Sequence, residues 1–280
     1  MNPKELSIII VTFKSDGKIS DCLDSIPNNI EVIIVENSNN QKFKKDIENK
    51  YENVRCILVG SNKGYAIANN IGLNKVQTKY GLVLNPDTNL SKNAIDNFFS
   101  TANKYPDFWL IGPAKGQQVD IDNKTEDIIA VKNLKGFAIF LNISKFDKNF
   151  FDENFFLYFE EIDLCKRLRE KGKNFYLIKK ITIKHLFAGT ARNLKKSKEL
   201  SHWSLRFWHF YWSSFYYHKK HYGYIKSFLI HITKLIRFFI KMNYLYFVND
   251  GDYNYITTRA KFNGILSQIL NKKSYFRINL

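Results

Sequence analysis

Short β-branched apolar runs alternate with helix-like segments through the first third of the chain. Between the apolar runs lie helix-like stretches over Asp16–Ile26, which ends at Pro27, and over Gly64–Val76. The repeated strand–helix–strand pattern predicts an α/β fold with a mostly parallel central sheet and helices on both of its faces. Leu6–Thr12 is a continuous β-branched apolar run, as expected for a strand covered on both faces, and three further apolar runs follow: Glu31–Glu36, Val54–Val59 and Tyr80–Leu84.

The remaining elements of this region are less regular. The pattern predicts one further strand over Ala130–Leu141, interrupted at Lys135–Gly136, and a helix that starts near Phe159 and ends at Gly172. Two short strands follow, over Phe175–Ile178 and Ile181–Lys184. Ligands of open α/β sheets bind outside the carboxyl ends of the strands, so residues 12–14, 36–38 and 85–87 become candidates for a binding site.

Positive charge is concentrated in the last third of the chain. The 280 residues carry a formal net charge of +17. Residues 1–190 hold 27 basic and 23 acidic side chains, a net charge of +4, whereas residues 191–280 hold 16 and 3, a net charge of +13. The composition changes near Arg192, which predicts one region over 1–192 and a helical, basic and aromatic-rich region over 193–280. An anionic partner, either a membrane or a nucleic acid, is implied by this asymmetry.

Cysteine usage bears on the compartment. The three cysteines are odd in number, widely spaced and without a CxxC pair, which argues against a disulfide framework or a zinc knuckle and suits a reducing cytoplasm. The apolar run near the N-terminus is too short for a signal peptide and is typical of a first buried strand. We therefore expect a cytoplasmic protein.

Acidic side chains occur at two places in the sequence that suit metal binding or general-base catalysis. Asp87, in Asn85-Pro86-Asp87-Thr88, directly follows a buried strand, where its carboxylate suits Mg²⁺ or Mn²⁺ and a diphosphate; the alternative is an ordinary Pro-Asp turn. Glu160, Glu161 and Asp163 follow an aromatic segment. A carboxylate there suits a general base, and the alternative is a solvated acidic first turn of a helix.

Two further signals are weaker on their own. His185 ends a strand and is either a metal or diphosphate ligand or a satisfied histidine. Asn62 and Gly64 lie between a strand and a helix, where the backbone can approach an anion or a ribose. This loop is neither GxGxxG nor a Walker loop, so dinucleotide-binding and P-loop interpretations lack their defining residues.

Taken together and in order, these segments resemble the family 2 inverting glycosyltransferases of the GT-A fold, in particular the bacterial rhamnosyltransferase-like branch. The resemblance covers roughly residues 5–192. It is carried by seven blocks: SIIIVTF (7–13), VIIVENS (32–38), NKGYAIANNIG (62–72), LVLNPDTNL (82–90), KGFAIFL (135–141), FFDENFFLYFEEIDLCKRL (150–168) and KHLFAGTAR (184–192).

The resemblance implies roles for individual residues. Glu161 falls at the position of the catalytic base, with Glu160 and Asp163 as alternatives, and Asp87 and His185 match the groups associated with Mg²⁺ or Mn²⁺ and the diphosphate. The family usually has Asp where this chain has Glu36 and Glu161, and often Asn where it has Lys14. The nucleotide-sugar would be held by Thr12, Phe13, Lys14, Glu36, Asn62, Gly64, Asn70, Asn85 and Gly136.

The basic region contains the sequence YIKSFLIHITKLIRFFIKMNYLYF over Tyr224–Phe247. On a helix, Lys226, Lys234, Arg237 and Lys241 lie near one face, and most of the apolar side chains lie opposite. So many charges oppose a transmembrane span, and the pattern favours a helix lying in the plane of an anionic membrane surface. The alternatives are packing on the first region or a homodimer interface.

The sequence thus predicts a metal-dependent inverting glycosyltransferase, peripheral on the inner face of the cell membrane. The expected donor is a dTDP- or UDP-linked hexose or deoxyhexose, with rhamnose favoured by the resemblance, and the acceptor is a lipid-linked or oligosaccharide hydroxyl in cell-surface polysaccharide synthesis. No nucleic acid partner is expected. The alternatives are a sugar nucleotidyltransferase, which lacks its Gly-rich basic loop after the first strand here, and a non-catalytic basic binding protein.

Overall fold

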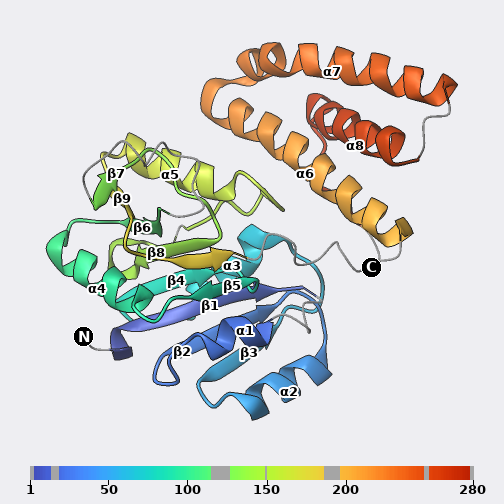
Figure 1. Ribbon diagram of the computed structural model, residues 1–280. Coiled ribbons are helices and arrows are strands. Elements are labelled where there is room, and N and C mark those ends of the chain that lie inside the picture. The colour runs from blue at the N-terminus through green and yellow to red at the C-terminus, as the bar shows by residue number, and fades with distance from the viewer. Residues whose placement is uncertain are drawn as a thin grey trace. The chain divides into compact units, whose positions relative to one another are not determined.

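A computed structural model describes residues 3–13, 19–114, 127–148, 150–185, 196–248 and 252–277. The chain forms two compact units, and each is described here by itself. The first comprises Met1–Asp152 and Glu160–Gly189, and the second comprises Glu153–Phe159 and Thr190–Leu280. Figure 1 shows the sheet of the first unit and the three long helices of the second.

An eight-stranded sheet forms the centre of the first unit, with the order β3-β2-β1-β4-β8-β6-β9-β7. Strands β1, β2, β3 and β4 are mutually parallel, and β8 and β7 run antiparallel to their neighbours. The mostly parallel α/β sheet predicted from the sequence is therefore confirmed. The bounds are β1 Leu6–Thr12, β2 Glu31–Glu36, β3 Val54–Leu58, β4 Tyr80–Leu84, β6 Leu110–Pro113, β7 Ile128–Ala130, β8 Ala138–Asn142 and β9 Phe175–Ile178.

Helices cover both faces of this sheet. Side chains of α1, α2 and α4 join the large core cluster on one face, and Ala68 and Ile71 of α3 pack with Ile33 and Val35 on the other. A methyl group on Gly72 would overlap the side chain of Ile9, so this glycine allows α3 to lie close to β1. The bounds are α1 Ile19–Asp24, α2 Gln41–Lys50, α3 Tyr65–Leu73, α4 Ala94–Lys104 and α5 Glu160–Glu170, with short 3₁₀ helices at Pro3–Glu5 and Ile143–Lys145.

Two segments differ from the sequence prediction. The interrupted strand expected over Ala130–Leu141 is two separate strands, because residues 131–137, which include the predicted interruption at Lys135–Gly136, separate β7 from β8 and the two strands pair with different neighbours. Gly136 lies in a turn within this separating segment, which explains why the apolar pattern breaks there. A small second sheet pairs β5 (Thr88–Leu90) with β10 (Ile183–His185).

The second unit, which we call the helical unit, consists of helices α6 (Lys196–Tyr222), α7 (Tyr224–Phe247) and α8 (Asp252–Ile269), together with residues 153–159. The sequence assigned residues 153–159 to the first region. Their aromatic side chains pack on α6 instead, for example Phe155 on Tyr216 and Phe156 on His209, and this packing accounts for the different assignment.

Helix α8 packs closely on α6. A methyl group on Gly264 would overlap the backbone carbonyl of Trp208, so the absence of a side chain lets the two helices approach. Trp208, Trp212 and Ala260 form the buried cluster beside this contact. The apolar core of the second unit therefore lies between α6 and α8.

Helix α7 turns a polar face inward. Its buried positions include Ser227 and His231, which bond to the backbone carbonyl of Phe215 and to the hydroxyl of Ser214 at 2.9 and 3.0 Å. Leu229 and Ile236 are exposed, as is Arg237, because the side of the helix that faces the rest of the unit is polar. Within the described residues, no helix is long and apolar enough to span a membrane.

Candidate active site

Strands β1 and β2 end side by side, and a buried carboxylate lies at that edge. The register pairs Thr12 with Glu36. The hydroxyl of Thr12 donates to one carboxylate oxygen of Glu36, and the hydroxyl of Ser38 donates to the other at 2.5 Å. Glu36 is fully buried. The carboxylate is therefore held between two strand ends, and the half-buried Phe13 follows Thr12 just beyond the end of β1.

Asn37 organises the loop before α3. Its amide nitrogen donates to Oδ1 of Asn62 at 3.0 Å and to the carbonyl of Gly64 at 3.1 Å. Its own amide oxygen accepts from the backbone N–H of Lys63 at 2.9 Å. Gly64 has φ +92°, a conformation that favours glycine. The sequence placed Asn37 within the candidate range 36–38 at the carboxyl edge of the sheet, but it gave this side chain no role of its own.

Tyr65, the first residue of α3, contacts both the segment that follows β4 and the turn that precedes β8. Its hydroxyl lies 3.0 Å from Oδ1 of Asn85 and 2.9 Å from the carbonyl of Gly136. Burial raises the pKa of Tyr65, and the nearby carboxylates of Glu160 and Glu161 raise it further. The sequence did not single out this tyrosine; a large amphipathic side chain in the first turn of a helix otherwise rich in small residues was its signal.

Asp87 lies next to this centre. Burial raises the pKa of both Tyr65 and Cys22, and the charge of Asp87 adds to the rise in each case. Thr88, the next residue, pairs with His185 through the β5–β10 ladder, so the backbone of His185 lies beside the Asp87 turn. The side chain of His185 and the whole of Lys14 lie outside the described residues.

Two carboxylates begin helix α5. Burial raises the pKa of Glu160 well above its ordinary value, and the Glu161 carboxylate adds to this effect. Burial also raises the pKa of Glu161, partly offset by the backbone N–H groups of residues 161 and 162. Among the described residues, Oε2 of each glutamate is buried without a hydrogen-bond partner. Buried acceptors are normally satisfied, so these two oxygens are marked as candidates for bonding to a substrate.

Gly136 lies directly against Glu161. A methyl group on Gly136 would lie 3.7 Å from both Cγ and Cδ of the glutamate. Because the carbonyl of Gly136 also meets the Tyr65 hydroxyl, this turn links Tyr65 and Glu161. The structure thus brings Asn85, Asp87, Gly136, Glu160 and Glu161 together around Tyr65.

Two residues predicted for the site, Asp163 and Asn70, have side chains that bond to other parts of the chain. The Asp163 carboxylate is fully buried and pairs with Nε of Arg167 at 2.8 Å, and Arg167 also donates to the carbonyl of Phe150. The side-chain amide of Asn70 exchanges two hydrogen bonds with the backbone of Phe151, at 2.9 and 3.0 Å. Both side chains therefore brace the segment that leads toward α5.

A divalent cation is compatible with this arrangement. Mg²⁺ commonly uses one or two protein carboxylates and takes its other ligands from substrate phosphates and water. Within the described part of the chain, no three His, Cys, Asp or Glu side chains gather as a ready-made metal site. Asp87, at the carboxyl end of β4, is the residue whose position and chemistry suit a cation shared with a diphosphate.

Comparison with known proteins identifies the family. Residues 7–165, more than half of the chain, match the family described as glycosyl transferase family 2, and the chain belongs to that family. A relative, the low-salt glycan biosynthesis hexosyltransferase Agl10 of Haloferax volcanii, is 26% identical over 197 residues, which cover 61% of this chain and 63% of that protein. The teichoic acid poly(glycerol phosphate) polymerase of Staphylococcus epidermidis is 30% identical over 148 residues, 48% of this chain and 20% of that one.

Solved structures show the same fold. The chain resembles S. aureus TarS with a TM-score of 0.51 at 16% identity, over 63% of this chain and 35% of that one. TarS 1–349 gives a TM-score of 0.52 at 12% identity, over 98% of this chain and 94% of that one. The predicted GT-A-type fold with a C-terminal helical extension is confirmed, whereas the rhamnosyltransferase-like branch stays a prediction. The chain spans less than two thirds of either curated relative.

Proposed function

We propose that this chain is a metal-dependent inverting hexosyltransferase that acts in glycan synthesis. The observation that carries the proposal is the pair of carboxylates at the start of α5, each with one buried oxygen that lacks a hydrogen-bond partner, which lie with Gly136 and Asp87 around Tyr65. A base with a raised pKa and an acid suited to a cation are the two groups that direct sugar transfer from a nucleotide diphosphate requires. Family membership and the hexosyltransferase relative support the same reaction class.

The chain's own groups account for the proton transfer. Glu161 accepts the proton of the acceptor hydroxyl as that oxygen forms a bond to the anomeric carbon. The bond between the anomeric carbon and the diphosphate oxygen breaks with its electron pair on the diphosphate, so the anomeric configuration inverts. Asp87 would hold the divalent cation, which when bound neutralises the charge of the departing diphosphate. Tyr65 and the turn at Gly136 fix the position of the base.

Glu161 is favoured over its neighbours as the base. Asp163 is fully buried and paired with Arg167, so its carboxylate is already occupied. Glu160 is only 5% exposed, whereas Glu161 is partly exposed and lies against Gly136. A base must contact the acceptor hydroxyl, and Glu161 is the one of the two glutamates that lies beside Gly136, where no side chain occupies the space.

The donor is proposed to be a dTDP- or UDP-linked hexose or deoxyhexose, with rhamnose first. The strand-end group of Thr12, Glu36, Asn62 and Gly64 would hold its nucleoside. The test incubates the purified chain with Mn²⁺ and a panel of nucleotide-sugars, with saccharide and lipid-linked acceptors. We expect transfer from one donor with inverted anomeric configuration by NMR, and loss of transfer in Asp87→Ala. Absence of donor turnover with every donor and acceptor would refute the enzymatic proposal.

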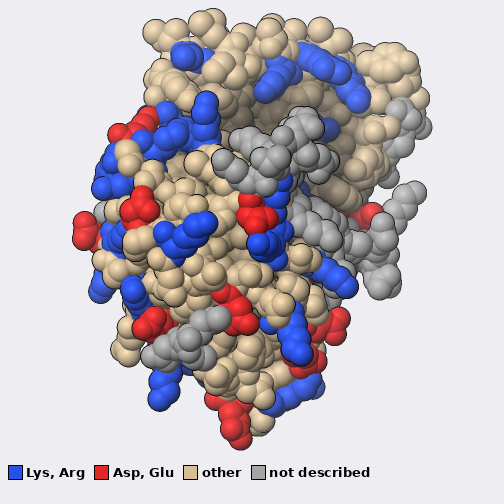
Figure 2. Space-filling view, turned by 60° about the vertical axis from the view of Figure 1, so that its left-hand side comes forward, with Lys and Arg blue, Asp and Glu red and all other residues tan. Residues whose placement is uncertain are grey.

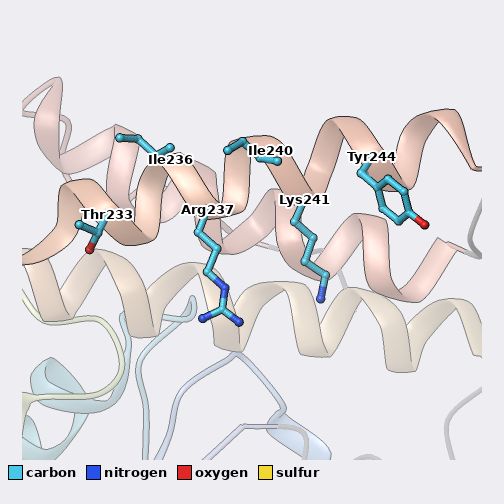
Figure 3. A pocket seen from close by; sticks show the side chains of 6 residues that line it. All are labelled: Thr233, Ile236, Arg237, Ile240, Lys241 and Tyr244. Carbon is cyan, nitrogen blue, oxygen red and sulfur yellow. The ribbon is translucent and has the colours of Figure 1, made fainter.

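The acceptor is proposed to be lipid-linked and reached at the inner face of the cell membrane through α7. Figure 3 shows Ile236 and Ile240 one turn apart on this helix, with Arg237 and Lys241 extending together in another direction. Ile225 and Ile240 are 76% and 62% exposed. Helix α7 contains no acidic residue, and Figure 2 shows basic side chains among uncharged ones on the visible surface of the helical unit. Exposed apolar side chains flanked by cations suit the interface of an anionic leaflet.

Vesicle flotation tests this surface. We expect recovery with vesicles that contain anionic phosphatidylglycerol, weaker recovery with neutral ones, and loss in the variant Arg237→Ala/Lys241→Ala. Lys42→Ala/Lys45→Ala on α2 removes the same charge from the other unit and serves as the control. Equal loss in both variants, or tight duplex DNA binding without vesicle recovery, would overturn the membrane proposal. A homodimer stays a prediction.

A further inference from the structure

The backbone just before α5 adopts an unusual conformation. Tyr158 and Phe159 have φ angles of +68° and +70°. Only four non-glycine residues of the described ranges have positive φ, and these two are consecutive. The left-handed region is unfavourable for bulky side chains, and such strain persists only where the surroundings impose it. The next two residues are Glu160 and Glu161, so the strained pair immediately precedes the proposed base.

Helix α6 supplies the contacts that hold this pair. Ser213 Oγ donates to the carbonyl of Leu157 at 2.9 Å, and Nε of Arg206 donates to the hydroxyl of Tyr158 at 2.7 Å. The ring of Phe159 packs on Phe210 with centroids 5.5 Å apart. These contacts fix a backbone carbonyl, a side-chain hydroxyl and a ring in three consecutive residues. We call residues 155–159 the aromatic anchor.

Further contacts fix the start of the anchor. Phe155 is fully buried and meets Tyr216 edge-on at 5.0 Å, and Phe156 stacks on the ring of His209 at 4.4 Å. Arg277, which follows α8 in the chain, lies over the ring of Phe156, with its guanidinium carbon 3.6 Å from the ring centroid. The conformation of the anchor is therefore determined by the helical unit over its whole length.

We propose that Ser213 and Arg206 are positioning residues that set the orientation of Glu161 through the strained backbone at 158–159. Phe159 has no side-chain acceptor to cap the first turn of α5, so the direction in which the chain enters that turn depends on the two preceding backbone conformations. Release of the anchor allows Tyr158 and Phe159 to relax to negative φ, and the first turn of α5 then loses its fixed geometry. The inference rests on the proposed function, since it assigns a purpose to the position of the base.

Two conservative substitutions test the proposal in the full-length chain. Tyr158→Phe removes only the hydroxyl that Arg206 binds, and Ser213→Ala removes only the donor to Leu157. Ser204→Ala is the matched control, because Ser204 is another buried serine of α6 whose hydroxyl bonds to Leu200 within its own helix. In both test variants we expect kcat to fall about tenfold with the donor KM changed less than about twofold, because misplacement of a catalytic group weakens the reaction more than binding. The control should retain the wild-type kcat.

Amide hydrogen exchange gives a readout that does not depend on turnover. In both test variants we expect residues 160–163 to exchange about threefold faster or more, because their local opening becomes easier. Unchanged kcat, or faster exchange confined to residues 155–159, would overturn the positioning role. If the wild-type chain transfers no sugar, the proposed function fails, while the exchange at residues 160–163 still decides whether the anchor controls the start of α5.

Discussion

A methyl group on Gly136 would lie 3.7 Å from the carboxyl carbon of Glu161, within ordinary van der Waals contact. Gly136 does not have a positive φ, so its backbone accepts a side chain without strain. The absence of a side chain at residue 136 is therefore not required by the fold. It leaves room beside the proposed base.

Gly136→Ala should consequently reduce activity without unfolding the chain. We expect kcat/KM to fall about 10–100-fold, because the methyl group occupies space needed for a correctly placed acceptor. Thermal unfolding should remain within about 2 °C of the wild type, a change that corresponds to less than about 1 kcal/mol. Wild-type activity in this variant would contradict a reactive position beside Glu161.

Substitution of Glu161 and Asp163 should separate catalysis from stability. Glu161→Gln should lower kcat about 10²–10⁴-fold, the usual contribution of a general base, while chemical denaturation shows no loss of stability. Asp163→Asn should lower the free energy of unfolding by about 1–3 kcal/mol, since it breaks a buried pair whose arginine is partly exposed. If Asp163→Asn abolishes kcat in folded protein and Glu161→Gln does not, the assignment of the base is wrong.

The pH dependence of activity should reflect the burial of Glu161. The base acts only when deprotonated, and burial raises its pKa. The acidic limb of the kcat/KM profile should therefore lie above about 4.3, the ordinary value for glutamate. Activity is lost as the pH falls through this limb. A profile that stays flat down to pH 4.5 would contradict a buried carboxylate as base.

The ionised Glu160 side chain should lower the free energy of unfolding at neutral pH. Because its pKa is raised in the folded chain, folding is favoured while the group is protonated, and this advantage is lost as the pH rises through the folded-state pKa. Glu160→Gln resembles the protonated form. We expect it to raise the free energy of unfolding by about 1 kcal/mol at pH 7.5, with no gain at pH 4. Denaturant titrations at both pH values check the sign.

The close contact between α6 and α8 should be intolerant of a side chain. Gly264→Ala would push a methyl group against the backbone of Trp208, which cannot move as freely as a side chain. Such overpacking costs about 1–3 kcal/mol. Helical circular dichroism should melt at a lower temperature than in the wild type. Gly60→Ala offers no comparison because its φ is positive, whereas Ser204→Ala on α6, the helix that carries Trp208, should melt normally.

The sheet was predictable because its strands are apolar on both faces. The bounds of β1, β2 and β4 follow from their short apolar runs, and the registers then bring Thr12, Glu36 and Asn85 to one edge. The interruption at Lys135–Gly136 was visible in the sequence, but the full length of the segment between β7 and β8 was harder to predict, since the pattern around this turn is otherwise strand-like. Local sequence also gives little sign that Asn70 and Asp163 brace a distant segment, because their partners Phe151 and Arg167 are identified only by tertiary contacts.

The acidic residues of the candidate site were predictable from the sequence, but the residues that hold them in place were not. Asp87, Glu160 and Glu161 follow strand or aromatic segments in a recognisable order. Tyr65 has no comparable marker, since its importance depends on Asn85 and Gly136 converging on one hydroxyl. The helical unit was predicted as basic and aromatic, but the strain at Tyr158 and Phe159 is a property of backbone angles that composition does not encode.

The polar inner face of α7 has a thermodynamic consequence. Ser227 and His231 face the rest of the unit, so folding leaves much of the apolar area of this helix in water. Transfer of Ile225, Leu229 and Ile240 from water into lipid would remove hydrated apolar surface, and association with vesicles should then carry a negative heat-capacity change. In that case the bilayer supplies the nonpolar layer that this helix lacks in the isolated chain.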